Sequence, residues 1–248
     1  MNWIEKRQKA ALKLNQDNMH LYRAVRLILK PIFMLLFRPL ISGQENIPKE
    51  GAAVVTANHR SFWDSAFQAL ATERPIRWMG KSELFRNPLL GRLFVHLGAF
   101  PVERGKGDQG AIHTAAMLLD RGELVALFPE GTRVREGLGE PKKGAARLAL
   151  DKGVATIPMS IVGTERGELR RALWRKDARV HIIVHSPVQA EIQSQDGQEA
   201  AGWLMKEKVW PIIKSGVDRL EGNRKKALAL GVGATLIGGA SWWLRRKR

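Results

Sequence analysis

The sequence LVALFPEGTR, residues 124–133, begins with five consecutive apolar residues and ends in turn-forming and charged ones. A short, continuously apolar run is typical of a strand buried on both faces in a parallel sheet. Ligands of such sheets bind beyond the carboxyl ends of the strands, which is where Glu130 and Arg133 stand. This stretch therefore predicts an α/β domain with its functional site at the end of a central strand.

Short apolar runs alternate with helical patterns on both sides of this strand. Asp108 is placed to cap one of the helices, and Gly122 to end it. The alternation indicates an α/β domain with a mostly parallel central sheet covered by helices. We expect further strands at 52–56, 76–79, 100–102, 154–161 and 180–184, and helices at 64–71, 88–97, 108–119, 144–152 and 197–220.

The composition limits the class of protein and the kind of partner. The chain has 248 residues, of which 44% are hydrophobic, so one domain with a sizeable core and extra terminal segments fits. It has no cysteine, which excludes disulfides and thiol nucleophiles. Its net charge of +17 implies an anionic partner, either nucleic acid or an anionic membrane surface. No known nucleic-acid module is visible and aromatic residues make up 7%, which favours the membrane.

An apolar segment near the amino terminus, residues 21–37, carries Arg23, Arg26 and Lys30 at three- and four-residue steps. On a helix these charges lie along one side and leave an apolar side opposite. The pattern predicts an amphipathic helix in a membrane interface, bent or broken at Pro31. The alternative is a helix that packs on the protein's own core.

The carboxyl-terminal segment 227–244 has no charged residue and is flanked by basic clusters at 224–226 and 245–248. As a helix it would extend about 27 Å, just short of a hydrocarbon core of about 30 Å. Its glycines weaken a free-standing helix, so it either spans a bilayer or lies on one. The chain thus divides into a membrane-interface helical segment at 1–42, a central domain at 43–221 and an apolar, basic-flanked tail at 222–248. We expect a chain cut after Leu220 to keep its activity in detergent.

The first chemical cluster, NHRSFWD at residues 58–64, follows the expected strand 52–56. A His whose ring is held by a carboxylate can act as a general base. His59 and Asp64 are five positions apart, so they meet when a tight turn lies between strand and helix. The alternative is a His that caps the helix beginning at Asp64.

Two further clusters also stand at strand ends. FPEGTR at 128–133 combines a glycine turn with Arg133, whose planar fork suits phosphate, and with Glu130, an acceptor of hydrogen bonds. FPVERG at 100–105 adds Arg104 as a second phosphate ligand. In isolation, each cluster also fits a surface turn with solvated charges.

Together with VATIP at 154–158, these clusters closely resemble the four sequence blocks of the 1-acylglycerol-3-phosphate acyltransferase family. The resemblance covers about residues 43–163, and the His-four residues-Asp block and the Glu-Gly-Thr-Arg block match fully. The second block often carries Asp-Arg in the family, where this chain has Glu103-Arg104. The resemblance implies a glycerolipid acyltransferase fold.

The resemblance also implies the site and its chemistry. His59 would be the general base and Asp64 its partner, with acyl-CoA or acyl carrier protein as co-substrate and no cofactor. No His pair stands at ligand spacing near an acidic cluster, so no metal is expected. The residues expected to bind substrate are Asn58, Arg104, Glu130, Gly131, Thr132 and Arg133.

The implied reaction moves a fatty acyl group onto the hydroxyl of 1-acylglycerol 3-phosphate and makes phosphatidic acid. Glycerol 3-phosphate, another lysophospholipid or a glycolipid are alternative acceptors, because such enzymes share the His-Asp block. A membrane-binding protein without enzymatic activity is an alternative of another class. The expected partners are acyl-CoA, the lysophospholipid acceptor and an anionic membrane surface, not nucleic acid. The expected place is the cytoplasmic face of the cell membrane.

Overall fold

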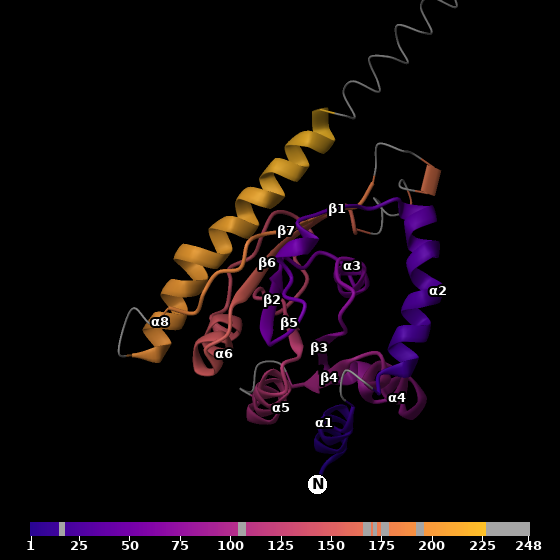
Figure 1. Ribbon diagram of the computed structural model, residues 1–248, viewed down its shortest axis with the longest axis vertical. Coiled ribbons are helices and arrows are strands. Elements are labelled where there is room, and N and C mark those ends of the chain that lie inside the picture. The colour runs from indigo at the N-terminus through magenta and orange to yellow at the C-terminus, as the bar shows by residue number, and fades with distance from the viewer. Residues whose placement is uncertain are drawn as a thin grey trace, which may run out of the picture.

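A central sheet of seven strands organises the chain (Figure 1). The computed structural model describes residues 1–14, 18–103, 108–165, 170, 173–174, 179–191 and 196–226. Across the sheet the strand order is β1-β7-β6-β2-β5-β3-β4. The strands are β1 (Leu40–Ser42), β2 (Ala53–Ala57), β3 (Ile76–Lys81), β4 (Ala99–Val102), β5 (Leu124–Leu127), β6 (Thr156–Val162) and β7 (His181–Val184).

Five neighbouring strands, from β6 through β2, β5 and β3 to β4, run parallel. β7 pairs antiparallel with β6, and β1 pairs parallel with β7, so these two run the other way. The expected α/β fold with a mostly parallel sheet is confirmed. β1 was missed because its three residues carry no strand pattern of their own.

Helices cover both faces of the sheet (Figure 1). Alternate residues of β2 point to opposite layers of helices. Val54 belongs to the core cluster that includes residues of α5, α6 and the helical run 197–226. Val55 belongs to the core cluster that includes residues of α2 and α3. The helices are α1 (Trp3–Lys13), α2 (His20–Phe37), α3 (Asp64–Leu70), α4 (Pro88–His96), α5 (Gln109–Asp120), α6 (Gly144–Lys152) and α8 (Gly197–Trp203), with short 3₁₀ turns at Gln44–Asn46 and Ser82–Phe85.

Side-chain caps explain several helix boundaries. Asp108 caps α5 by accepting a hydrogen bond from the Ala111 N–H at 2.9 Å, as the sequence predicted. Asn87 caps α4, whose first residue is Pro88, where a missing N–H costs no hydrogen bond. These local signals begin the helices near the positions that the sequence indicates.

Helix α1 lies within the segment 1–42, for which the sequence predicted helical structure. It begins with a capping box between Asn2 and Glu5 and buries Ala11 against the domain core. The fully buried guanidinium of Arg77 contacts the carbonyl oxygen of Ala11 and lies 3.4 Å from a carboxylate oxygen of Glu123. The first part of the predicted interface segment 1–42 is therefore packed into the domain.

Helix α2 continues through Pro31 without interruption, so the expectation of a break there is wrong. Tyr22 and Phe33, on either side of the proline, are buried and hold the helix on the domain. Arg26 donates hydrogen bonds to the carbonyl oxygens of Ala69 and Thr72, so this member of the expected basic stripe faces the protein. No helix among the described residues is both long and apolar enough to cross a membrane.

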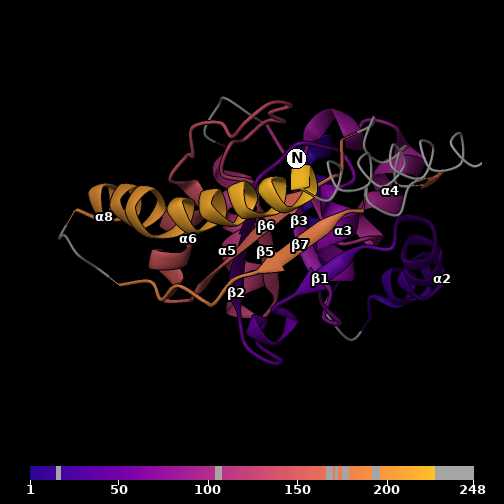
Figure 2. The same ribbon diagram turned by 90° about the horizontal axis from the view of Figure 1, so that it is seen from above.

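We use the name C-terminal helix for the helical run 197–226, which comprises α8, a π-helical stretch (Leu204–Val209) and residues 210–226. It runs along the sheet on the side away from α2 (Figure 1 and Figure 2). Gly216 lies so close to the sheet that a Cβ there would be 2.2 Å from Ser160 Oγ and 2.6 Å from His185 Nε2. The helix extends beyond the expected end at Leu220, and the expected apolar tail 227–244 lies outside the described residues.

Candidate active site

The site forms where neighbouring parallel strands end. β2 lies between β5 and β6, and Thr56 pairs with Leu127 on one side and with Pro158 on the other. The segments that follow these strands therefore leave the sheet at the same edge. They are residues 58–64, 128–139 and 163–165.

His59 and Asp64 meet across the turn between β2 and α3. His59 Nδ1 lies 2.8 Å from Asp64 Oδ2, and both side chains are buried. Asp64 is the first residue of α3, so its position depends on where that helix starts. The turn brings together two residues that five positions would separate on a regular helix or strand.

The Asp64 carboxylate accepts hydrogen bonds from several directions. Oδ2 also accepts the backbone N–H groups of Arg60 and Ser61, each at 2.8 Å. Oδ1 accepts the hydroxyl of Thr164 at 2.5 Å. These donors hold the carboxylate in one orientation relative to His59.

The environment of the His59 ring sets its tautomer and its plane. Because an ionised Asp64 can only accept, Nδ1 carries a hydrogen and the neutral ring presents the lone pair of Nε2. The ring stacks on Phe128, with centroids 3.9 Å apart and planes 13° from parallel. A ring held at one nitrogen and along one face can take a proton at the other nitrogen.

Glu130 supports the main chain on both sides of this pair. One carboxylate oxygen accepts the His59 N–H at 3.0 Å and the other accepts the Gly139 N–H at 3.1 Å. Burial raises the pKa of Glu130, and the two backbone hydrogen bonds act against that rise. The His59 carbonyl in turn accepts the Val134 N–H at 2.8 Å. Together with the stacked ring of Phe128, these hydrogen bonds fasten the segment 128–139 to His59 at three points.

Comparison with known proteins gives the family of this chain. The model of the family described as "Acyltransferase" matches residues 38–162, which is half of the chain. The chain belongs to this acyltransferase family. That range contains the His59–Asp64 pair and the whole Glu130 segment, and it confirms the resemblance seen in the sequence.

Individual members of the acyltransferase family show the same relationship. The chloroplastic 1-acyl-sn-glycerol-3-phosphate acyltransferase LPAT1 of Arabidopsis thaliana is 31% identical over 159 residues, which are 60% of this chain and 43% of that protein. The 1-acyl-sn-glycerol-3-phosphate acyltransferase of Bacillus subtilis is 28% identical over 169 residues, 68% of this chain and 82% of that protein. The chain therefore spans less than half the length of the plant relative.

A solved acyltransferase structure shares the fold. The crystal structure of the 1-acyl-sn-glycerophosphate acyltransferase PlsC from Thermotoga maritima superposes with a TM-score of 0.63 at 26% identity. The match covers 81% of this chain and 79% of that one. It extends beyond the four motif blocks and includes most of the helices and strands described above.

The other residues expected to bind substrate differ in their positions. Arg104 lies outside the described residues. Thr132 and Arg133 are exposed after Gly131, which adopts φ +69°. A left-handed backbone there favours glycine, and a Cβ would lie 3.0 Å from Lys142 Nζ. Their roles in binding stay predictions.

Asn58 is fully buried and faces β6. Its side-chain N–H donates to the carbonyl oxygen of Ile161, and its side-chain oxygen accepts the Ile161 N–H, both at 2.8 Å. This pairing occupies both ends of the amide and fastens the end of β2 to β6. The geometry supports a positioning role for Asn58 and lends no support to the expected substrate contact.

Sequence reasoning missed Thr164 and Lys142. Thr164 follows β6 and is one hundred positions from the Asp64 it binds, so no local pattern could have indicated it. Lys142 lies beside Gly131 and its N–H donates to the Pro129 carbonyl oxygen. The paired lysines at 142–143 before a helix were a visible signal for a cation near Gly131.

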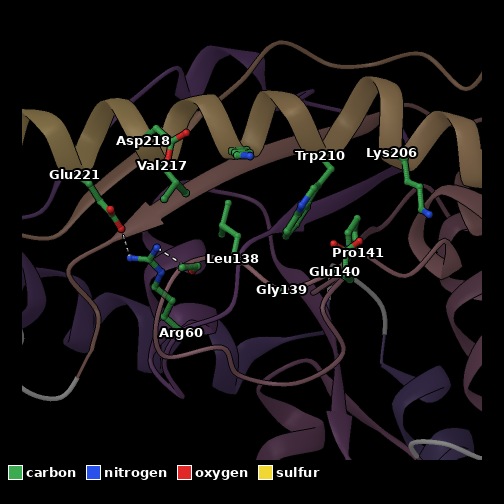
Figure 3. Close-up of a pocket in the computed structure, with 12 residues that line it drawn as sticks. Arg60, Leu138, Gly139, Glu140, Pro141, Lys206, Trp210, Val217, Asp218 and Glu221 are labelled. Carbon is green, nitrogen blue, oxygen red and sulfur yellow. Dashed lines mark hydrogen bonds and ion pairs between the residues drawn. The ribbon is translucent and has the colours of Figure 1, made fainter.

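A cavity of about 470 Å³ lies between the C-terminal helix and the segment 137–141 (Figure 3). Arg60 and Glu221 form one end of it, and Trp210 and Lys206 lie toward the other. His59 is not among the described residues that line this cavity. Arg60, its neighbour in sequence, therefore links the cavity to the turn at residues 58–64.

Proposed function

We propose that this chain transfers a fatty acyl group from acyl-CoA or acyl carrier protein to the hydroxyl of 1-acylglycerol 3-phosphate, which makes phosphatidic acid. The pairing of His59 with Asp64 at the end of β2 carries the proposal. Family membership and the names of the Arabidopsis and Bacillus relatives support the acceptor.

The proposed step is a direct transfer with His59 as general base. Nε2 takes the proton of the acceptor hydroxyl, and the oxygen attacks the thioester carbonyl carbon. The carbon–sulfur bond then breaks, and the thiolate takes the proton from Nε2. Asp64 stabilises the imidazolium that forms in between. General-base assistance of this kind contributes about 10²–10⁴ in rate, and the remainder comes from holding hydroxyl and thioester in register.

The acceptor phosphate is assigned to the basic residues near Gly131. Arg133 is exposed at the end of the segment that Glu130 fastens to His59, and Arg104 follows β4 in the sequence. A guanidinium binds a phosphate monoester with two parallel hydrogen bonds. Replacing Arg133 with Ala should raise the KM for the acceptor far more than the KM for acyl-CoA, and Lys should restore it in part.

Membrane contact is assigned to the outer face of α2. Leu27 and Leu35 are 78% and 77% exposed, and six further large apolar side chains on this helix are also exposed. A contiguous exposed apolar surface of this kind marks a membrane or protein contact. Acceptor and product both reside in a bilayer, so a helix that contacts the catalytic turn and the lipid suits the reaction. The proposed location stays the one expected from the sequence, the cytoplasmic face of the cell membrane.

The test is an acceptor panel with purified protein. Acyl-CoA of several chain lengths is combined with 1-acylglycerol 3-phosphate, glycerol 3-phosphate, other lysophospholipids and a glycolipid, and the lipid products are identified by mass. We expect phosphatidic acid and hydroxyl-dependent release of free thiol. Preference for another acceptor would reassign the substrate within the same chemistry. Absence of acyl transfer to every acceptor, from both acyl-CoA and acyl carrier protein, would refute the proposed function.

A further inference from the structure

Arg60 stands next to His59, yet its side chain leaves the catalytic turn and runs beneath the C-terminal helix (Figure 3). Its guanidinium lies 2.6 Å from a carboxylate oxygen of Glu221 and 3.1 Å from one of Glu165. It also donates to the Gly137 carbonyl oxygen at 3.0 Å. The side chain is 7% exposed, so these contacts form largely away from water.

The backbone of Arg60 belongs to the catalytic geometry. Its N–H donates at 2.8 Å to Asp64 Oδ2, the same oxygen that holds His59 Nδ1. A shift of the Arg60 main chain would therefore move the carboxylate that orients the base. The position of the Arg60 side chain and the orientation of His59 are coupled through one residue's backbone.

Two of the three partners of the guanidinium lie in segments that also contact the catalytic pair. Gly137 lies between Val134 and Gly139, whose N–H groups bind the His59 carbonyl and the Glu130 carboxylate. Glu165 follows Thr164, whose hydroxyl binds Asp64. Arg60 thus holds together the turn and the two neighbouring strand-end segments.

The third partner, Glu221, brings in the C-terminal helix. That helix makes a second close contact with the same edge of the sheet, because a Cβ at Gly163 would lie 2.7 Å from the Arg224 guanidinium. Gly163 directly precedes Thr164 in the sequence. The last turns of the C-terminal helix therefore reach both sides of Asp64, through Arg60 and through the 163–165 segment.

The charges make this arrangement specific. Burial acts to lower the pKa of Arg60, but the hydrogen bond and charge of Glu221, with the charge of Glu165, outweigh it and raise the pKa above its ordinary value. A planar guanidinium holds five N–H donors in a fixed fork, so it can meet two carboxylates and a carbonyl in one preset geometry, whereas an ammonium has three rotatable donors on a flexible stem. Loss of one carboxylate would leave a buried guanidinium less well paired.

We propose that Arg60 is a positioning residue for the His59–Asp64 pair, and that Glu221 makes the end of the C-terminal helix part of the support of the active site. The inference rests on the proposed acyl transfer. It assigns to Arg60 no contact with substrate. Its effect must therefore fall on turnover and leave the binding of acceptor and donor unchanged.

The experiment compares Glu221→Gln with Asp218→Asn in the full-length protein, assayed in detergent micelles with acyl-CoA and 1-acylglycerol 3-phosphate. Both variants remove one negative charge from the same helix beside the same cavity, but Asp218 is exposed and makes no ion pair with Arg60 among the described contacts. A displacement of about 1 Å can cost up to about 10²-fold in rate, so we expect Glu221→Gln to lower kcat roughly tenfold per mole of folded protein. Both KM values should stay the same, and Asp218→Asn should match wild type.

Three results would overturn the inference while wild type remains active. These are an unchanged kcat in Glu221→Gln, a change confined to KM, or an equal loss in Asp218→Asn. A lower melting temperature with normal kcat per folded molecule would show that the pair serves stability alone. Glu221→Asp, which keeps the charge, should recover part of the lost turnover. An inactive wild type would instead refute the proposed function.

A pair of truncations tests the same idea from the other direction. A chain that ends at Lys226 and one that ends at Leu220 both lack residues 227–248, and they differ in whether Glu221 and Arg224 are present. The first should keep its kcat in micelles, and the second should lose at least as much as Glu221→Gln. The sequence analysis expected a chain cut after Leu220 to keep its activity in detergent. The proposed role of Glu221 predicts a loss of kcat instead, because the cut removes a partner of Arg60. Equal activity of the two shortened chains would refute the role of the helix end.

Discussion

Two helices on different sides of the molecule reach the same catalytic turn, residues 58–64, by different forces. α2 reaches it with aromatic rings: the Phe33 ring centroid lies 5.9 Å from that of Trp63, within the turn, and 5.4 Å from that of Phe67 in α3. The C-terminal helix reaches it through the ion pair of Glu221 with Arg60. One contact is apolar and non-directional, and the other fixes a distance and a direction.

The solvent-facing sides of the two helices show the same contrast between apolar and charged side chains. α2 exposes large apolar side chains, whereas the C-terminal helix exposes charged ones such as Lys208, Lys214 and Asp218. An apolar contact tolerates small sliding of the helix, which suits an element that enters and leaves a lipid surface. A buried ion pair does not. We infer that α2 links the turn to the membrane, while the C-terminal helix holds the turn in its reactive geometry.

The largest effect should come from removing His59, which lies in the turn that both helices contact. His59→Ala should lower turnover at least about 10²-fold, the low end for loss of a general base, while the fold is retained. Asp64→Ala should act in the same direction and less severely, because it removes the partner and leaves the base. Steady-state rates in micelles and circular dichroism give the measurement. A near-normal rate in His59→Ala would refute the proposed mechanism. It would also refute the idea that the two helices support a catalytic turn.

The inner face of α2 should act mainly on stability. Phe33 is buried in the aromatic cluster, and truncating a buried Phe costs about 3–5 kcal/mol of the free energy of unfolding. We expect Phe33→Ala to lose that much in denaturant unfolding, and Phe33→Leu to lose much less. If both variants instead keep their stability and lose kcat, α2 would hold the geometry of the turn as the ion pair does, and the contrast between the helices would fail.

The outer face of α2 should act on membrane binding. Replacing Leu27 and Leu35 with Ser removes two of its most exposed apolar side chains. Binding to vesicles that contain anionic lipid should weaken more than tenfold, because each methylene buried in lipid contributes roughly 0.8 kcal/mol, while kcat in micelles stays at the wild-type value. Ile112→Ser, an exposed apolar residue of α5 in the other helical layer, is the matched control. Equal binding of the double variant and wild type would exclude this face as the lipid contact.

The smallest effect concerns pH and the sheet beneath the C-terminal helix. Burial, and then the charge of Arg219, lower the pKa of His185, whose Nε2 lies 2.8 Å from Ser160 Oγ. The pKa of His185 is therefore lower in the folded state than its ordinary value of about 6.5. The stability that this residue contributes is fully present above the ordinary pKa and is lost as the pH falls through the folded-state pKa. The free energy of unfolding should thus fall between about pH 7.5 and about pH 5.5. The fall should be smaller in His185→Asn than in a control at the exposed His96, and an identical fall in both would refute this.

Much of the fold followed from local patterns. Continuously apolar runs predicted β2 and β5, and the cap at Asp108 marked the start of α5. The pairing of His59 with Asp64 also followed, because a strand, a tight turn and a helix start allow little else. In these cases the physical cause lies within about ten residues of sequence.

The contacts that were missed depend on how distant segments align. Thr164 reaches Asp64 because β6 lies beside β2, and Arg60 reaches Glu221 because of the rotation of a helix more than 150 positions away. The bounds of α1 were missed because five polar and charged residues, 5–9, separate its apolar positions, and the capping box at Asn2 was not read as a start signal. At Pro31 the sequence predicted a helix end that the structure does not have. Buried side chains on both sides of the proline stabilise a helix that helix propensity alone would end.

The close approach of Gly216 to the sheet has a consequence for mutational tolerance. Any side chain at this position would need room that Ser160 and His185 occupy, so the C-terminal helix would have to move outward. Five residues further along the same helix is Glu221, and an outward shift there would lengthen its contact with Arg60. In a scan of every substitution at every position, position 216 should therefore tolerate as few replacements as residues of the catalytic turn, although it lies beneath a surface helix outside that turn.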